Sequence, residues 1–436
     1  MKSKLIPVFV SIIFILAGCG TTANLNESEL VSTETMELVK SETEEINVET
    51  SQSEEIVEEI TIDKSSEFKL EQVKPINKFY TEYDGKIYYR QYSAEDKVSG
   101  ELFGGYGDVI EVTEKDLMCM DDSGNVNKVG TDNGIGALVI VDGKLYSQKR
   151  NNGFINQVYS CDLSGENEKT YESSDVVGLI GDSIICTAPQ KGIYVIDTKS
   201  QEEKLLSDTA NEYLFAANDS IFYVENDENG SAIIYSVTLN GEISKIVEVT
   251  TEDLEKYTGS VAFLVKITCT QTANNKIYFS AGSYGGSTNM YQGGIIASVN
   301  ADGTDFEIVD EFATDKFYVL EDSSLTITEG DKVREPYFSD SSDVCIIRDT
   351  NSSEEILMSK SEYEGLGLGG LDDYIDETYW AMSEMELVGD KFFFTISTGT
   401  HDASQDIGWR TYYTRDVSSV FCKNMTTGDI TMLYTY

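Results

Sequence analysis

A short pattern of residues returns along most of the chain, from about residue 77 to residue 436. Each copy has an apolar run, a two-residue polar turn and a second run rich in Ile, Tyr and Phe. Asp, Asn and Gly fill most of the turns, and these residues tolerate the positive φ angles of two-residue β-hairpins. The pattern therefore predicts a long series of hairpins with almost no helix. The turns lie near residues 84, 142, 182, 219, 275, 322 and 390.

A second hairpin follows each copy, as at Val158–Gly165 and Ile234–Gly241. Two hairpins make a unit of four antiparallel strands. The shortest spacing between units is 37 residues, just under the ~40–45 residues of a four-stranded propeller blade. Radial repetition of such sheets leaves only short, protected edges. The sequence therefore predicts an all-β fold, a β-propeller of four-stranded antiparallel blades.

Seven blades are favoured, and six or eight remain open because the copy at Asp322–Ile327 is degenerate. Two stacked β-sandwiches are the alternative architecture, which the regular repeat disfavours.

The N-terminus has the layout of a bacterial secretory signal. Lys2 and Lys4 precede a nearly all-apolar run, Leu5–Gly18, which is shorter than the roughly 20 residues of a spanning helix. The run ends in Leu16-Ala17-Gly18-Cys19, which resembles the bacterial lipobox. This resemblance implies cleavage before Cys19, acylation of its thiol and an extracytoplasmic protein held on the cell membrane by lipid. An ordinary signal peptide with an incidental cysteine is the alternative.

Residues 19–66 are expected to form an acidic tether between a signal peptide at 1–18 and a propeller at 67–436. Between Glu27 and Asp63 there are 13 acidic residues and one lysine, without Gly, Pro or aromatic residues. Such a segment buries too little apolar surface to offset its ordering entropy. A marginal helix near Glu54–Ile62 is the alternative.

The net charge of −45 argues against nucleic acid as a partner, because phosphates need a basic surface. Loose calcium binding to the many carboxylates stays open, but no cofactor or metal site is predicted.

Six cysteines remain after Cys19, and they show no CxxC spacing. Buried free thiols are favoured over disulfides, because nearly all lie within apolar runs. The six are Cys119, Cys161, Cys186, Cys269, Cys345 and Cys422.

The turn at Asp84–Tyr89 and the later motif Tyr-x-x-Asp-x-x-Gly at Tyr159–Gly165 resemble a bacterial propeller-like domain family of unknown function. That family is common in clostridial lipoproteins and is similar in repeat style to the TolB-like and YWTD-type propellers. The resemblance covers roughly residues 77–436. It implies export and binding, and it transfers no catalytic residues.

Long insertions are expected at one edge of the blades only. Strands alternate in direction, so the first and third connections of a blade lie at one edge, and here they are short. The predicted insertions lie at the opposite edge, at 91–115, 280–293, 328–342, 360–384 and 397–418. Loops on a rigid scaffold commonly carry binding residues.

Aromatic and acidic residues gather in these insertions, a combination that suits protein or sugar ligands. We therefore predict a non-catalytic module that binds a protein or a cell-wall glycan. Packing of the aromatics under their own loops is the alternative. The candidate ligand-binding residues are Trp380, Trp409, Tyr412, Tyr413, His401, Tyr284, Tyr291, Tyr106 and Asp373.

No catalytic residue is predicted. The single histidine excludes HExxH, and Ala281–Gly286 lacks the first glycine of GxSxG. Gly365–Gly370 contains GxGxxG but has no clear βα context. Glu225–Gly230 opens like a calcium loop, yet Ser236 stands at position twelve. Two other functions stay open, a carbohydrate-active enzyme with paired carboxylates and a scaffold subunit of an envelope complex.

Overall fold

The computed structural model of the protein describes thirteen stretches of the chain: 69–74, 76–92, 115–151, 155–188, 192–259, 263–285, 290–311, 317–319, 325–327, 335–348, 353–366, 378–401 and 413–436. All of them fall within one compact unit, Ser65–Tyr436. The predicted signal peptide, Cys19 and the whole tether at 19–66 lie outside the described residues and remain predictions.

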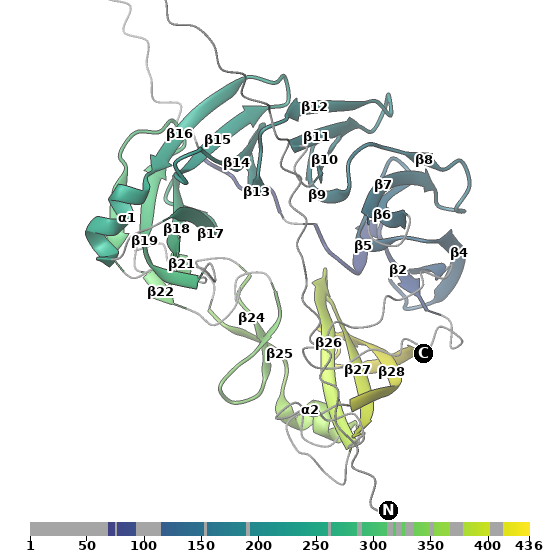
Figure 1. Cartoon of the computed structure of the whole chain (residues 1–436). Coiled ribbons are helices and arrows are strands. Elements are labelled where there is room, and N and C mark those ends of the chain that lie inside the picture. The colour runs from purple at the N-terminus through teal and green to yellow at the C-terminus, as the bar shows by residue number, and fades with distance from the viewer. Residues whose placement is uncertain are drawn as a thin grey trace, which may run out of the picture. The chain divides into compact units, whose positions relative to one another are not determined.

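Six sheets in the described part of the chain have four antiparallel strands joined in sequence order (Figure 1). The first sheet contains β1 (Tyr80–Tyr83), β2 (Lys86–Gln91), β3 (Lys115–Met120) and β4 (Val126–Asp132). The second contains β5 (Ile135–Val141), β6 (Lys144–Asn151), β7 (Ile155–Asp162) and β8 (Lys169–Thr170). The third contains β9 (Asp175–Ile180), β10 (Ser183–Ala188), β11 (Gly192–Asp197) and β12 (Glu203–Ser207). The fourth contains β13 (Glu212–Ala217), β14 (Ser220–Asn226), β15 (Ala232–Thr238) and β16 (Ile243–Val249). The fifth contains β17 (Leu264–Ala273), β18 (Lys276–Gly285), β19 (Met290–Asn300) and β20 (Glu307–Asp310). The last contains β26 (Thr378–Val388), β27 (Lys391–His401), β28 (Tyr413–Asn424) and β29 (Ile430–Thr435).

The predicted two-residue turn joins the first and second strands of all six sheets. Asp84, Asp142 and Asn218 each have a φ of 51° there, a conformation that Asp and Asn adopt more easily than most residues. The predicted fold is therefore confirmed: the chain is an all-β protein with the architecture of a β-propeller.

The predicted second hairpin is also present. In the turns after β3, β7 and β19, the N–H of Gly124, Gly165 and Gly303 donates to the carbonyl oxygen three residues earlier, at 2.8–2.9 Å. All three glycines have a positive φ, which favours glycine.

The sixth repeat departs from the others. β21 (Phe317–Val319) pairs with β22 (Leu325–Ile327), whereas β23 (Tyr337–Phe338), β24 (Val344–Ile346) and β25 (Glu355–Met358) form a separate three-stranded sheet. The connecting residues 320–324 and 328–334 lie outside the described part of the chain. The number of seven blades therefore remains a prediction.

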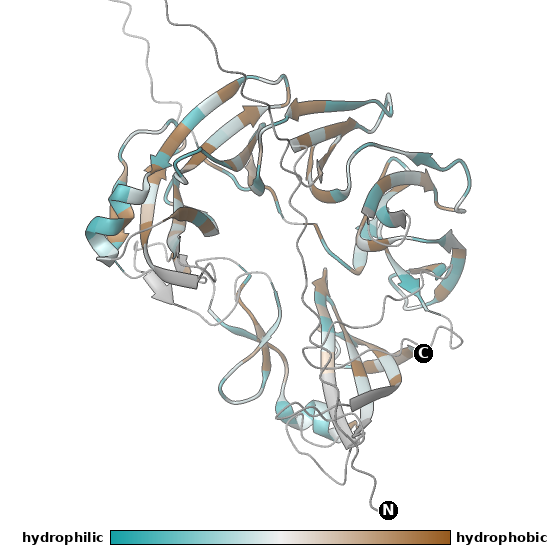
Figure 2. Cartoon of the chain, viewed as in Figure 1, coloured by the Kyte–Doolittle hydropathy of each residue, from teal (hydrophilic) through white to brown (hydrophobic). Residues whose placement is uncertain are grey.

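Hydrophobic clusters lie between neighbouring sheets, and hydrophobic residues run along the strands (Figure 2). One cluster joins the first sheet to the last, because Tyr80 and Tyr89 pack with Phe393 and Val420. The rings of Tyr80 and Phe393 stack with centroids 4.0 Å apart. The first and last sheets thus pack together, and in the part of the chain that the structure describes they share no strand.

The segment before β1, residues 69–79, ties several sheets together and is called the strap below. The Val73 N–H donates to the Ala216 carbonyl at 2.8 Å, and the Asn218 N–H donates to the Glu71 carbonyl at 3.0 Å. The Leu70 N–H donates to Asn275 Oδ1 at 2.6 Å. In Figure 1 this purple segment runs from beside β13 towards β5.

Two short helices were not predicted, α1 (Thr251–Thr258) and α2 (Lys360–Gly365). Thr250 and Asp253 form a capping box at the start of α1, and Gly259 caps its end with a φ of 66°. Leu254 of α1 is fully buried against the fifth sheet. The spacing of Thr250, Asp253 and Gly259 was the available sequence signal. No helix of the described residues is long and apolar enough to span a membrane.

The prediction of buried free thiols is confirmed for five cysteines, Cys119, Cys161, Cys186, Cys345 and Cys422. Burial raises the pKa of Cys161 to about 12 and that of Cys422 to about 11. The thiols of Cys161 and Cys422 therefore stay protonated and pack as small apolar groups.

Gly303 tests how closely neighbouring sheets approach. A Cβ atom at this position, where φ is +84°, would lie 2.6 Å from the Ile246 carbonyl oxygen of the fourth sheet. Gly303→Ala should lower the free energy of unfolding by about 2–4 kcal/mol, since backbone strain and a backbone clash add. Gly124 has a φ of +81° with nothing within 4 Å, so Gly124→Ala should cost only about 1 kcal/mol. Denaturant unfolding measures both variants, and equal losses would refute the close approach.

Candidate functional site

Topology separates two edges of each sheet. The first and third connections lie at the turn edge, and the second connection and the crossing to the next sheet lie at the loop edge. The insertions predicted at 280–293 and 397–418 are wrong in extent, because β18 continues to Gly285 and β28 begins at Tyr413. The connections are residues 286–289 and 402–412. Ala281 and Ser283, which fall inside the predicted insertion 280–293, are fully buried within β18.

Two of the three other predicted insertions, 328–342 and 360–384, are also shortened. β23 occupies Tyr337–Phe338 within the expected insertion 328–342, and α2 and the start of β26 occupy much of 360–384. The insertion at 91–115 agrees with the structure, since β2 ends at Gln91 and β3 begins at Lys115.

Five candidate residues lie on strands near the loop edge rather than in loops. The register pairs Tyr284 with Tyr291 across β18 and β19, and His401 with Tyr413 across β27 and β28. Trp380 lies on β26 opposite Thr398. The backbone thus brings two predicted pairs together. The remaining candidates, Trp409, Tyr412, Tyr106 and Asp373, lie outside the described residues.

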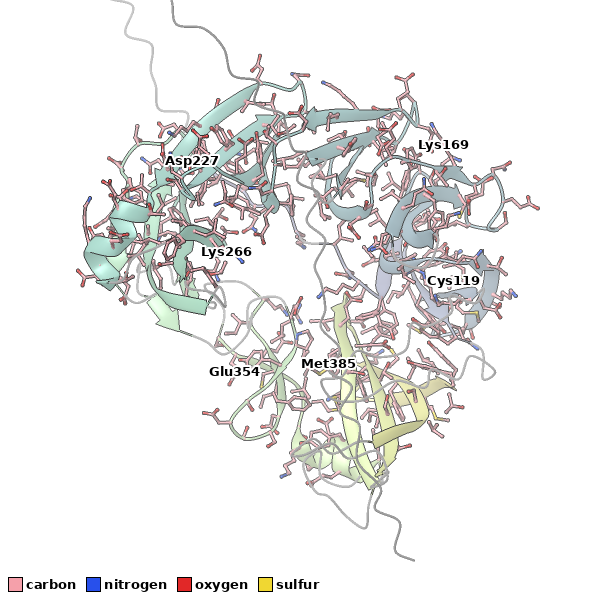
Figure 3. The ribbon with its side chains drawn as sticks, viewed as in Figure 1. Cys119, Lys169, Asp227, Lys266, Glu354 and Met385 are labelled. Atoms are coloured by element: carbon pink, nitrogen blue, oxygen red, sulfur yellow. The ribbon has the colours of Figure 1, made fainter. Side chains whose placement is uncertain are left out.

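The side chain of Tyr284 is half-buried. The ammonium of Lys266, which is labelled in Figure 3, lies near this ring. Its distance from the ring centroid is 4.8 Å, within the range of a cation–π contact. Burial raises the pKa of Glu212 on neighbouring β13, and the positive charge of Lys266 opposes that rise. Opposite charges and an aromatic ring therefore meet where the fourth and fifth sheets adjoin.

Two aromatic residues of this edge were missed from the sequence. Phe263, just before β17, is 67% exposed, and Tyr257 on α1 is 37% exposed. The Phe263 N–H donates to the Tyr284 carbonyl at 3.1 Å, so Phe263 adjoins a predicted residue. Their connection was not recognised as a loop-edge insertion because α1 was not predicted.

A buried charged network between the first and second sheets is satisfied internally. Arg90 Nε lies 2.5 Å from Asp132 Oδ2, and Arg90 Nη1 donates to the Gly136 carbonyl at 2.8 Å. The Tyr159 hydroxyl donates to Asp132. Burial opposes ionisation of Asp132, but the Arg90 charge and these hydrogen bonds outweigh it and lower its pKa. We assign this network to packing of the two sheets.

No group of three or more His, Cys, Asp or Glu side chains among the described residues is arranged to hold a metal ion. Asp227, in the calcium-like stretch, instead accepts backbone N–H groups of Asn229 at 2.9 Å and Ser231 at 2.8 Å in the turn between β14 and β15. This stretch therefore forms the end of β14 and the tight turn of a β-hairpin.

A cavity of about 260 Å³ lies where the strap meets β26 and the residues just before β23. Its lining includes Lys78, Phe79, Glu335, Glu384, Glu386 and Leu387. Glu384 has a φ of 51° within a bulge of β26, where the register shifts between Ser383 and Glu386.

Glu386 holds the strap to the last sheet. Its carboxylate accepts the backbone N–H groups of Lys78 at 2.8 Å, Phe79 at 3.0 Å and Tyr80 at 2.8 Å. Burial raises the pKa of Glu386 to about 7, and these hydrogen bonds and the Lys78 charge only partly oppose it. A carboxyl group with a pKa near neutrality thus lies where the strap and the first sheet meet the last sheet.

No protein-family model matches the chain, and no curated protein matches it. Similar solved structures include the N-terminal domain of Nup159, with 11% identity, 84% of this chain and 91% of that chain covered, and a TM-score of 0.35. A putative TolB from Agrobacterium tumefaciens has 10% identity, coverage of 54% and 80%, and a TM-score of 0.30. An oligogalacturonate lyase from Vibrio parahaemolyticus has 11% identity, coverage of 83% and 86%, and a TM-score of 0.33. Likenesses of this size carry no argument about function.

Glu386 should make stability depend on pH. The pKa of Glu386 is about 7 in the folded protein and 4.5 ordinarily, so the folded state binds this proton more tightly than the unfolded state does. Protonation of Glu386 therefore adds most to the free energy of unfolding below pH 4.5, and this contribution disappears as pH rises through 7. Glu386→Gln should remove it, so the free energy of unfolding of wild type relative to the variant should fall by up to about 3 kcal/mol between pH 4.5 and 8. Urea unfolding across this range measures the difference. Parallel profiles would contradict the burial of this carboxyl.

Proposed function

We propose that this protein is an extracytoplasmic lipoprotein, anchored to the cell membrane through Cys19, whose propeller binds a protein or a cell-wall glycan without catalysing a reaction. The anchor is supported by Lys2 and Lys4, the short apolar run and the sequence Leu16–Cys19. The acidic segment that follows would keep the propeller away from anionic lipid, since like charges repel and extend the chain.

The observation that carries the binding role is the contrast between the two edges of the sheets. At the turn edge the strands of the six complete sheets are joined by tight turns held by backbone hydrogen bonds. At the loop edge of the fifth sheet, Phe263 is exposed beside Tyr284, whose ring contacts Lys266, and Glu212 lies within the field of that ammonium group. Tyr257 is exposed on α1, in the connection that leads into this sheet. Exposed aromatic faces next to charged groups are typical of recognition surfaces.

The backbone supports a wider surface of the same kind. Trp380, Tyr291, His401 and Tyr413 lie on strands that reach the loop edge of the fifth and last sheets. The strands that carry them are among the longest in the described chain, at 11 or 12 residues. A backbone already fixed in a hairpin loses less conformational entropy on binding than a loop does.

Phe263→Ala should weaken capture of isolated cell envelopes at least about 10-fold, because exposed aromatic anchors often contribute more than 1 kcal/mol. The melting temperature should not change, since Phe263 is 67% exposed. Ile243→Ala is the matched control, since this exposed apolar residue begins β16 at the turn edge. Envelopes treated with protease or with a glycan hydrolase separate a protein ligand from a glycan ligand. Equal effects of the two substitutions would refute the loop edge as the binding surface.

Cys19→Ser should release the chain from the membrane fraction and abolish incorporation of labelled fatty acid, because the acyl chains supply the anchoring energy. Cys422→Ser, which removes a buried thiol, should leave both properties unchanged. Retention of the Cys19→Ser chain in washed membranes would contradict lipid anchoring, while leaving the binding role of the propeller to be judged separately.

A further inference from the structure

The cavity at the strap is bounded by three segments that lie far apart in the sequence. The strap supplies Lys78 and Phe79, β26 supplies Glu384–Leu387, and the residues before β23 supply Glu335 and Pro336. Met385, labelled in Figure 3, marks the β26 wall. The cavity therefore exists only where the first, sixth and last repeats meet.

The size of the cavity limits its occupant. Its volume of about 260 Å³ is slightly below the ~300 Å³ at which small-molecule sites begin, so it suits one long side chain rather than a large ligand. Phe79, Pro336 and Leu387 provide apolar walls. An occupant should therefore combine a short aliphatic chain with one polar head.

Charge in the cavity favours a cationic head. Three carboxylates line it against one ammonium group, and Lys78 Nζ lies 3.1 Å from Glu335 at the exposed rim, where their side chains are 63% and 62% exposed. Deeper inside, Glu386 is held by backbone N–H groups, which carry no net charge. A buried carboxylate gains most from a cation that comes within contact distance.

We propose that this cavity binds a primary ammonium group on a short aliphatic chain, with a lysine side chain of a protein partner as the occupant. The apolar walls would contact the methylene groups, and Glu384 and Glu386 would face the ammonium head. This site is separate from the loop edge and does not depend on the function proposed for it.

Binding of a cation in this cavity should be coupled to the protonation state of Glu386. The titratable groups near Glu386 are Lys78 on the strap, Tyr80 on β1, Glu384 on β26, Glu335 before β23 and Tyr434 on β29. An ammonium ion bound beside Glu386 favours its charged form, so binding near neutral pH should release a proton. Because the pKa of Glu386 is about 7, its ionised fraction rises about 30-fold from pH 5.5 to pH 8. The affinity for the ammonium group should rise by at most the same factor.

Calorimetry on the full chain in detergent tests this directly. The probes are Nα-acetyl-lysine methylamide and its neutral analogue Nα-acetyl-norleucine methylamide, in two non-amine buffers that differ in heat of ionisation. The lysine probe should bind at least about 10-fold more tightly than the norleucine probe, a difference of about 1.4 kcal/mol, with proton release at pH 6.5. Equal affinities, absence of proton release or absence of any binding heat at millimolar probe would each overturn the proposal.

Variants of the rim separate recognition from folding. Glu386→Gln should abolish the pH dependence of binding, but it also alters the strap contact. Glu335→Gln and Lys78→Gln change exposed side chains and should preserve the fold. Glu335→Gln should weaken binding of the lysine probe about threefold and Lys78→Gln should strengthen it similarly, because one removes an attractive charge and the other a competing cation. Changes in the same direction for both variants would also overturn the proposal.

Discussion

Each of the six four-stranded sheets has to cover two apolar faces, and this constraint explains the architecture. In β10, Ile184 and Cys186 belong to the cluster shared with the second sheet, whereas Ile185 belongs to the cluster shared with the fourth. β27 repeats the arrangement, with Phe392 and Phe394 on one side and Phe393 on the other. Strands buried on both faces read as continuous apolar runs, and only a neighbour on each side can cover both faces.

A row of such sheets has two ends, and each end would expose an apolar face to water. The chain solves this by packing the first sheet on the last, through Tyr80 on Phe393 and Tyr89 on Tyr434. Since no strand of the described residues is shared between the first and last sheets, side chains supply hydrogen bonds of the junction. Glu386 accepts the N–H groups of the strap and of Tyr80, and the Tyr434 hydroxyl donates to the Arg90 carbonyl at 3.1 Å. A buried carboxyl is a costly choice for this purpose, but it fixes one register of the strap against β26 because three successive N–H groups converge on it.

The repeating part of the fold was predictable because its signals are local. Asp84, Asp142 and Asn218 occupy left-handed turn positions, and the alternation of turns with apolar runs gave both the strand order and the four-stranded unit. The junction was not predictable, because Glu386 and the strap are separated by about 300 residues and nothing local marks Glu386 among the many acidic residues of the chain.

The sequence identified candidate binding residues, but it placed in loops five of them that lie on strands. The length of chain between the predicted second and third strands was assigned to loops, as at 280–293. In the structure the first part of that range continues β18, while α1 packs on the same sheet and buries Leu254. The consequence was to place Tyr284 in a loop and to overlook Phe263 and Tyr257. Helix capping by Thr250 is a local signal, but the burial of a short helix on a sheet is a tertiary effect.

The two proposed sites differ in the forces that they use, and the charge of the chain connects them. A net charge of −45 produces a long-range field that attracts basic partners and speeds their encounter at low ionic strength. That field acts on both edges of the sheets, so it cannot decide where a partner docks. Docking is decided over short distances, by apolar and aromatic contact at Phe263 and Tyr257 and by charge at Glu384 and Glu386 inside a cavity that only the closed ring forms. Added salt should therefore slow association with either site, while the difference between a cationic and a neutral occupant of the cavity should persist, because buried charges are screened far less than exposed ones.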